Sequence, residues 1–341
     1  MNYRRLGNTG LIVSELCLGT MTFGSQFFNI ATLDQAGSDE LVKHSLEAGI
    51  NFFDTADVYS FGQSEEITGR AIKNAGASRD AVIIATKVFS PMTSAAWQGT
   101  GDYNHRGLSR KHIIAACEAS LKRLGTDYID LYQVHGFDLQ TPVEETLRAL
   151  DDLVRHGKVR YLGCSNWPAR HLAKTLGLAE GRGWEKFVSL QAYYSLVGRD
   201  LEHELLPLCR EENLGVLPWS PLSGGFLSGK YRRDATAPEG ARRASFDFPP
   251  VDPRGYDAVE ALDEIAGAKD SSVAQVALAW LLHQPGVASV IIGANKMSQL
   301  ADNLKAVSVK LSADEVTSLS ATTAPPKLYP QWMIERQNTG R

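Results

Sequence analysis

Eight short runs of apolar and β-branched residues recur along this chain, and each is separated from the next by a stretch of helical length. Runs without strict alternation, such as VIIATK and IDLYQV, are typical of parallel strands that are buried on both faces. Eight such strands alternating with helices predict an α/β fold, a (β/α)8 TIM barrel. The candidate strands are residues 16–19, 51–54, 82–87, 129–135, 159–165, 188–191, 216–219 and 289–292.

The segments between these runs carry helix signals. Ser64 followed by two glutamates is typical of a helix start, and Ser109 precedes RKHIIAACEASLKRL, whose apolar residues recur at helical spacing. We expect Pro142 in the first turn of a helix that ends at Gly157. At the front of the chain, two short runs flank the turn-rich LGNTG, so residues 3–5 and 11–13 are predicted to form an N-terminal β-hairpin.

Two segments are longer than barrel turns require, and the tail of the chain is aromatic. Residues 89–107 and 220–253 are long loops, which in a compact fold are usually functional, so we expect substrate or cofactor contacts there. The tail, residues 325–341, contains Tyr329 and Trp332 and looks too aromatic to be a free end. It predicts extra C-terminal helices or loops beyond the barrel.

Length and charge limit the classes of protein that fit. A barrel routinely takes about 250 residues or more as one unit, so the 341 residues are expected to form a single domain, 1–341. A net charge of −4 favours neither nucleic acid nor an anionic membrane as a partner. No apolar run approaches the roughly 20 residues that span a bilayer, and MNYRRLGNTG lacks the apolar run of a secretory signal. We therefore expect a cytoplasmic protein; its oligomeric state is left open.

The four cysteines lie far apart, and each is beside apolar residues: Cys17, Cys117, Cys164 and Cys209. There is no CxxC pair and no dense cysteine framework. The pattern predicts reduced, mostly buried thiols and no metal site.

Polar residues stand where the predicted strands end, and active sites of such barrels gather at the carboxyl ends of their strands. Asp54 closes the second predicted strand, Lys87 the third and His135 the fourth. Tyr59 follows Asp54 by five residues, on the next loop. Ser165, Asn166 and Gln191 stand at the ends of the fifth and sixth strands.

The first four of these residues suggest one chemistry. A tyrosine normally keeps its proton to about pH 10, but a nearby ammonium anchored by a carboxylate would stabilise the phenolate and lower that pKa. Tyr59 would then donate a proton to a carbonyl oxygen, with His135 positioning that oxygen or assisting the transfer. Taken singly, each residue has an ordinary alternative: Asp54 as a turn former, Lys87 as a solvated charge, and the two rings as packed side chains. Their coincidence at successive strand ends favours the functional interpretation.

At these residues the sequence resembles the aldo-keto reductase family. The block GINFFDTADVYSFGQSEEITGRAI contains Asp54 and Tyr59, ATK contains Lys87, and DLYQVHGFD contains His135. The likeness runs over nearly the whole chain and points to the bacterial and potassium-channel β-subunit branch. It implies that the four residues form a catalytic tetrad in which tyrosine is the general acid.

The resemblance also implies cofactor contacts. LGTM places Thr20 and Met21 near the cofactor, beside Asp54, and GCSNW suggests that Ser165 and Asn166 bind the nicotinamide carboxamide, with Gln191 next to them. In VLPWSPLSGGFLSGKY, Trp219 would stack on the nicotinamide ring; a buried core aromatic is the alternative. The pyrophosphate contacts would come from Ser220, Pro221, Leu222 and Gly224. Lys230 and Arg243 are candidate phosphate-binding cations, with solvated loop charges as the alternative.

The last block, VIIGANKMSQLADNLKA, resembles the adenosine-binding segment and implies contacts from Gly293, Asn295, Gln299, Asp302 and Asn303. Some family members have lysine and arginine where this chain has Gly293 and Gln299, although Lys296 and Arg243 would compensate. NADPH/NADP+ is the expected cofactor, and NADH is the alternative. No GxGxxG loop follows the first strand, so a Rossmann domain is not supported.

The leading hypothesis is an NADPH-dependent oxidoreductase that reversibly reduces a small-molecule aldehyde or ketone to an alcohol. One alternative is an NADPH-binding regulatory or redox-sensing subunit with weak turnover. A phosphate-binding barrel isomerase would leave Trp219 without a role. Aromatic residues suit a bulky carbonyl pocket but would equally serve loop packing: Phe23, Phe27, Phe28, Trp97, Tyr103, Trp167, Tyr329 and Trp332.

Overall fold

The computed structural model of the chain describes residues 1–25, 27, 30–233, 243 and 247–340. The predicted hairpin is present at the start: β1 (Tyr3–Arg5) pairs antiparallel with β2 (Ile12–Ser14). The second strand begins one residue later than predicted because Leu11 belongs to the turn, where its carbonyl accepts from the backbone N–H of Leu6 at 2.9 Å.

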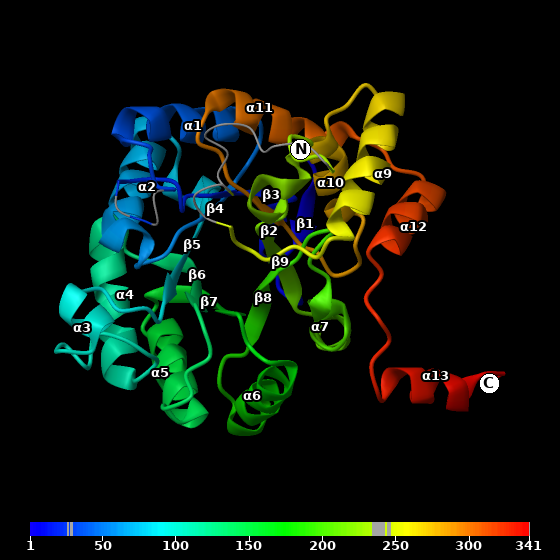
Figure 1. Cartoon of the computed structure of the whole chain (residues 1–341). Helices are drawn as coiled ribbons and strands as arrows, with labels where there is room; N and C mark the ends of the chain where they lie inside the picture. Colours follow the sequence, from blue (N-terminus) through cyan, green and yellow to red (C-terminus); the bar gives the residue numbers. More distant parts are fainter. Residues whose placement is uncertain (26, 28–29, 234–242, 244–246, 341) are drawn as a thin grey trace.

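Eight parallel strands follow this hairpin in the chain and form a barrel, which confirms the predicted (β/α)8 architecture (Figure 1). Their hydrogen-bonded order is β10-β3-β4-β5-β6-β7-β8-β9, and the ring closes where Val216 pairs with Val287, just before β10. Each strand coincides with a predicted run to within two residues at either end. The strands are β3 (Leu16–Gly19), β4 (Phe52–Asp54), β5 (Ile83–Val88), β6 (Ile129–Val134), β7 (Val159–Ser165), β8 (Phe187–Tyr193), β9 (Gly215–Trp219) and β10 (Val290–Ile292).

Helices surround the barrel and connect its strands (Figure 1). The α-helices in the described ranges are α1 (Gln35–Glu47), α2 (Gln63–Asn74), α3 (Ser94–Gln98), α4 (Arg110–Leu124), α5 (Val143–Arg155), α6 (Ala169–Arg182), α7 (Leu205–Glu211), α9 (Gly255–Ala268), α10 (Val273–Leu282), α11 (Met297–Leu304), α12 (Ala313–Thr322) and α13 (Gln331–Asn338). Short 3-10 turns are η1 (Tyr59–Gly62), η2 (Arg79–Ala81), η3 (Asp200–Glu202), η4 (Ser223–Ser228) and η5 (Lys305–Ser308).

The predicted helix signals act at the helix ends. Ser109 caps α4, since its hydroxyl accepts from the backbone N–H of His112 at 3.3 Å. Pro142 lies one residue outside α5, at the cap, instead of in the first turn; its missing N–H costs nothing there either. Beyond the end of α5, Gly157 takes φ 73°, a left-handed conformation that suits glycine.

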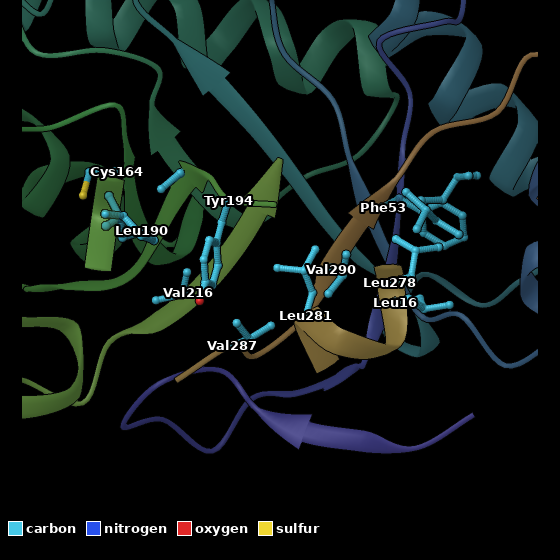
Figure 2. Close-up of a cluster of buried hydrophobic side chains, with 14 of the residues drawn as sticks. Leu16, Phe53, Cys164, Leu190, Tyr194, Val216, Leu278, Leu281, Val287 and Val290 are labelled. Atoms are coloured by element: carbon cyan, nitrogen blue, oxygen red, sulfur yellow. The ribbon is translucent and has the colours of Figure 1, made fainter. Parts of the chain in front are cut away.

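Two layers of apolar packing hold the barrel. Leu6 and Val13 of the hairpin region pack with Cys17, Phe52 and other strand residues, so the hairpin shares a core with the barrel. Figure 2 shows the second layer, where side chains of strands and of α10 meet. Leu16, Phe53 and Val290 come from strands, and Leu278 and Leu281 come from α10. All four cysteines are buried and none forms a disulfide.

The predicted extra C-terminal structure is present as α13, but the tail does not pack as predicted. In Figure 1, α13 lies apart from the barrel at the red end of the chain. Tyr329 is 74% exposed and Trp332 43% exposed; their rings contact each other, with centroids 6.0 Å apart. Gln331 ties the helix to His203 through a hydrogen bond to its backbone carbonyl. The aromatic content therefore misled the prediction, because the two rings pack against each other while remaining largely in solvent.

The two long loops are present. The first contains α3 and the second begins with η4, while much of the rest of the second lies outside the described ranges. Within the described ranges, no helix combines the length and apolarity that a membrane span requires.

Candidate active site

Parallel strand register brings the predicted polar residues to one rim of the barrel. Asp54 is the last residue of β4, Lys87 is next to last in β5, and His135 follows β6 directly. Ser165 ends β7 and pairs in register with Gln191 of β8. Because all these strands run in the same direction, the residues at their carboxyl ends share one end of the barrel.

Lys87 is the centre of this group and is fully buried. Its Nζ donates to Asp54 Oδ1 at 2.6 Å, to the backbone carbonyl of Thr55 at 2.8 Å and to the hydroxyl of Tyr59 at 3.2 Å. Burial lowers the pKa of Lys87, but the charge of Asp54 and the neighbouring Tyr59 outweigh it and the pKa is raised above its ordinary value. The side chain is therefore an ammonium whose three donors are all used.

Tyr59 is placed by an irregular turn. It follows Val58 in η1, where Ser60 and Phe61 take positive φ of 49° and 51°. Burial raises the pKa of Tyr59 above its ordinary value, Lys87 lowers it, and Asp54 raises it again. The predicted lowering by Lys87 is thus present as a contribution, but the predicted net direction is wrong for this structure because burial outweighs it. The phenol keeps its proton at neutral pH.

His135 faces Tyr59, with ring centroids 5.7 Å apart and planes 80° apart. Its Nδ1 is buried and has no hydrogen-bond partner in the described part of the chain. Burial and the charge of Lys87 hold the pKa of His135 well below its ordinary value, so the imidazole is neutral. A neutral imidazole therefore faces a protonated phenol at the barrel rim.

The second carboxylate oxygen of Asp54 accepts hydrogen bonds from two glutamine amides, one on β6 and one on β8. Gln133 and Gln191 each donate from Nε2 to Asp54 Oδ2 at 2.9 Å, and Gln191 also donates to Gln133 Oε1 at 3.2 Å. Gln133 was missed in the sequence analysis, although a glutamine inside the apolar run IDLYQV was a signal. Its register partner on β5 is Lys87, so the two side chains share the barrel interior.

Ser165 and Asn166 form a polar corner next to His135. Asn166 takes φ 57°, and its Nδ2 donates to the backbone carbonyl of His135 and to Ser165 Oγ, both at 3.0 Å. The amide nitrogen is thus used within the protein. Asn166 is exposed, whereas Ser165 is buried.

Trp219 ends β9 between two other rings. Tyr193 lies at 5.1 Å and 35° from it, and Phe248 stacks on it at 6.0 Å and 13°. Its Nε1 is buried without a hydrogen-bond partner in the described ranges. Trp219 is partly exposed, so it is not the fully buried core aromatic of the alternative interpretation.

The segment after Trp219 is a chain of tight turns. Ser220 takes φ 50° and Gly224 φ 63°; a Cβ at Gly224 would lie 2.5 Å from the carbonyl oxygen of Phe248. Pro221 is buried and Leu222 partly buried. Arg243 Nη1 donates to the carbonyls of Ser223 at 3.0 Å and Pro249 at 2.8 Å, and the guanidinium also pairs with Asp247. Lys230 Nζ lies 5.5 Å from the ring centroid of Tyr231. The two predicted cations are therefore in contact with this segment.

The predicted adenosine residues cluster around α11. Gln299 Oε1 accepts from the backbone N–H of Asn295 at 2.8 Å, and Asn303 Nδ2 donates to the carbonyl of Gly293 at 3.3 Å. Asp302 lies nearby and accepts from Ser272 at 2.8 Å and from Gln275 at 2.6 Å. A Cβ at Gly293 would meet open space, whereas Asn295 Oδ1 is buried without a partner in the described ranges.

Thr20 and Met21 follow β3, the strand that pairs with β10. Thr20 Oγ1 donates to the carbonyl of Asp54 at 3.2 Å, and Met21 packs against the cluster of Ala56, Val58 and Tyr59. The described residues contain no group of three or more histidine, cysteine, aspartate or glutamate side chains arranged to hold a metal ion.

The predicted aromatic pocket is only partly assembled. Phe27 contacts Tyr59 edge-on, with ring centroids 5.3 Å apart. Phe23 and Trp167 are buried in the core, and Trp97 and Tyr103 are exposed. Phe28 lies outside the described residues.

The buried aspartate, lysine and tyrosine and the facing histidine lie at the carboxyl rim of a (β/α)8 barrel, where enzymes of this fold carry their active sites. The sequence profile of the Aldo/keto reductase family matches residues 15–323, and this chain belongs to that family. Its members in general use a nicotinamide cofactor and act on small molecules.

Similar proteins carry several functional names. The chain is 37% identical over 351 residues to versiconal hemiacetal acetate reductase of Aspergillus parasiticus, covering 97% of this chain and 99% of that protein. It is 37% identical over 343 residues to a putative aryl-alcohol dehydrogenase of Schizosaccharomyces pombe, covering 95% and 96%. A probable voltage-gated potassium channel subunit beta of Oryza sativa subsp. japonica is 39% identical over 316 residues, covering 91% and 92%. The reductase and dehydrogenase names support an oxidoreductase.

Proposed function

We propose that this protein is an NADPH-dependent reductase that converts an aldehyde or ketone to an alcohol, reversibly. The observation that carries the proposal is the 3.2 Å contact between the Lys87 ammonium and the Tyr59 hydroxyl, with Asp54 anchoring that ammonium at 2.6 Å. This arrangement supplies a proton donor whose conjugate base is stabilised beside it.

Tyr59 is the proposed proton donor to the carbonyl oxygen. As its proton leaves, the phenolate that forms lies against the Lys87 ammonium, which is desolvated and therefore interacts strongly with it. Asp54 keeps the ammonium in position, and the two glutamine amides keep Asp54 in position.

His135 is proposed to orient the carbonyl oxygen by a hydrogen bond from its neutral ring. The neutral form suits this role because it adds no charge that would hold the substrate oxygen after protonation. The ring faces Tyr59, so His135 and Tyr59 can both form a hydrogen bond to one carbonyl oxygen.

The residues at the rim fit a nicotinamide dinucleotide. Three buried polar atoms lack partners in the described ranges and lie on residues proposed to surround it: His135 Nδ1, Trp219 Nε1 and Asn295 Oδ1. Ser165, Asn166 and Gln191 would hold the carboxamide, and Trp219 would cover one ring face. Thr20, Met21 and Asp54 would lie on the other side. When bound, the reduced nicotinamide supplies a hydride to the carbonyl carbon.

The remaining cofactor contacts are proposed along two segments. Ser220, Pro221, Leu222 and Gly224 would surround the pyrophosphate, with Lys230 and Arg243 as cations beside it. Gly293, Asn295, Gln299, Asp302 and Asn303 would surround the adenosine. We favour NADPH because Arg243 and Lys296 add positive charge near these segments; NADH is the alternative because neither Gly293 nor Gln299 carries a charge for a 2′-phosphate.

A second candidate function is an NADPH-binding regulatory or redox-sensing subunit with weak turnover. The identity with potassium channel subunits beta favours it. Bound NADPH that is oxidised once, slowly, with every carbonyl tried would support this candidate over the reductase.

The decisive experiment is a panel of aldehydes, ketones and alcohols, with NADPH and NADH tested separately and absorbance of the reduced nicotinamide as the readout. The reductase proposal expects multiple turnovers with at least one carbonyl and a lower KM for NADPH than for NADH. Multiple turnovers with no carbonyl or alcohol would contradict it. One domain over residues 1–341 and a cytoplasmic location remain predictions.

A further inference from the structure

A cavity of about 330 Å³ lies beside the barrel rim and outside the group around Tyr59. One wall is the loop after β6 with the first turn of α5, residues 137–144. The other wall is the first turns of α6, through Arg170, His171, Lys174 and Thr175. Small-molecule sites commonly have volumes from about 300 to 1,000 Å³, so the cavity suits a compact ligand.

Two buried polar atoms on α6 point to a ligand there. Thr175 is only 1% exposed and lines the cavity, yet its hydroxyl has no hydrogen-bond partner in the described ranges. His171 Nδ1 is also buried without such a partner. The residues are four apart on α6 and therefore lie on the same helix face. A buried polar group without a hydrogen bond destabilises the fold, and a ligand that supplies the bond would remove this cost.

The positive charges at the cavity are gathered on one wall. Arg170 and Lys174 are exposed side chains on the α6 wall. Partial burial, together with these two cations, lowers the pKa of His171, so its ring is neutral at pH 7. Glu144 stands on the opposite wall and offsets one cation.

Asp138 lines the cavity too, but its carboxylate is already engaged. It accepts from the backbone N–H groups of Leu108 at 2.7 Å and Gln140 at 2.8 Å, and from the Thr141 hydroxyl at 2.7 Å. These bonds outweigh partial burial and lower the pKa of Asp138, so this carboxylate is a structural part of the loop. Glu144 and the ionised Asp138 thus equal the two cations in number, but both carboxylates lie on the loop wall, so the α6 wall beside the Thr175 hydroxyl is positively charged.

The rest of the wall is apolar. The ring of Phe137 stacks on His171 at 4.1 Å and 22°, Val143 is partly buried, and Leu139 is 88% exposed at the edge of the cavity. We propose that this cavity binds a small organic carboxylate. Its apolar body would lie against Phe137, Val143 and Leu139, and its carboxylate would accept from the Thr175 hydroxyl beside Arg170 and Lys174.

This site is connected to the proposed active site through the backbone. Asn166 donates to the carbonyl of His135 and Trp167 Nε1 to that of Gly136, both at 3.0 Å, and the ring of Phe137 packs edge-on against Trp167 at 5.0 Å. A ligand that holds Phe137 against α6 would stabilise the loops that carry His135 and Asn166. The inference does not depend on which reaction the protein catalyses.

The test is calorimetric titration of the full chain with benzoate, with benzamide and inorganic phosphate as comparison probes. Carboxylates also bind near proton-donating side chains, so the titration is repeated in Tyr59→Phe, where the proposed cavity is intact. We expect saturable benzoate binding that Tyr59→Phe leaves in place and that is about tenfold weaker for benzamide and for phosphate. Phosphate binding as tightly as benzoate would overturn the proposal that the ligand has an apolar body as well as a carboxylate.

Variants of the residues that line the cavity test whether benzoate binds there. Thr175→Val should weaken benzoate binding about fivefold or more, Thr175→Ser should retain it, and the double variant Arg170→Gln/Lys174→Gln should weaken it about tenfold. Arg182→Gln, at the far end of α6, is the matched control and should have no effect. Benzoate affinity that is equal in the wild type, Thr175→Val and the double variant would overturn the proposal, as would no saturable binding up to about 50 mM.

Discussion

The Lys87 ammonium lies 3.2 Å from the Tyr59 hydroxyl, and both groups are buried. In this pair, burial raises the pKa of Tyr59 while Lys87 lowers it. The phenol therefore remains protonated through the neutral range. The ammonium stabilises the phenolate that forms when the proton leaves. A general acid with a stabilised conjugate base is what carbonyl reduction needs.

Replacing Lys87 with methionine should change the pH dependence of the reverse reaction. Alcohol oxidation needs Tyr59 without its proton, so its rate rises with pH towards the Tyr59 pKa. Loss of Lys87 removes the lowering contribution, raises the Tyr59 pKa further, and should move this rise to higher pH. Turnover near pH 7 should fall about 10²-fold or more.

The measurement is kcat for alcohol oxidation from pH 6 to about 11, with Lys87→Arg as a control that keeps a cation. Circular dichroism and NADPH binding report whether each variant folds. A rise of kcat with pH that stays in place, or moves to lower pH, in Lys87→Met would contradict the assignment.

Gln133 and Gln191 should act together on stability. Each donates to Asp54 Oδ2 at 2.9 Å, so either single change to leucine leaves one donor. Each single variant is expected to lose about 1–2 kcal/mol of unfolding free energy. The double variant should lose more than the sum, because it leaves a buried carboxylate oxygen without a donor. Urea unfolding of the four proteins measures this, and a strictly additive result would sink the idea.

The positions of the strands were predictable because each buried parallel strand is a continuous apolar run. Contacts that depend on the register between strands were not predictable from the sequence. Gln133 was visible as a polar residue in an apolar run, but its partner Asp54 lies 79 positions away in the chain. The net pKa of Tyr59 depends on its depth of burial, which the neighbouring residue types do not report. The tail shows a further limit: Tyr329 and Trp332 predicted packing, yet they contact each other in solvent.

Asp57 provides a prediction about how stability depends on pH between acidic and neutral conditions. Its side chain is fully buried, Oδ1 accepts from the backbone N–H of Val58 at 2.6 Å, and Oδ2 has no partner in the described ranges. Burial and the charge of Glu65 hold the pKa of Asp57 well above its ordinary value. The folded state then binds a proton that the unfolded state has lost, so stability falls as pH rises above about 4.

Asp57→Asn removes this proton linkage and keeps the shape of the side chain. Its unfolding free energy relative to the wild type should increase steadily from pH 5 to pH 8, measured by urea unfolding at each pH. A difference that is constant across this range, or that shrinks, would show that the carboxyl is already ionised in the folded protein.

His112 should contribute to acid sensitivity. Burial lowers its pKa to about 4, with a smaller effect of His105. The unfolded state binds a proton below about pH 6.5 while the folded state does not, so stability is lost as pH falls from 6.5 towards 4, by about 3 kcal/mol. His112→Leu should flatten this limb of the pH–stability curve, whereas His44→Gln, at an exposed histidine, should leave it unchanged. An equally steep limb in His112→Leu would refute the assignment.

The most direct test of the central claim is Tyr59→Phe, which deletes one hydroxyl and keeps the ring that contacts Phe27 and His135. NADPH binding is measured by titration, and oxidation of bound NADPH by a carbonyl substrate is followed in a single turnover. We predict NADPH affinity within about threefold of the wild type and a rate lower by about 10³-fold, because the substrate oxygen loses its proton donor. An unchanged single-turnover rate in Tyr59→Phe would contradict the account.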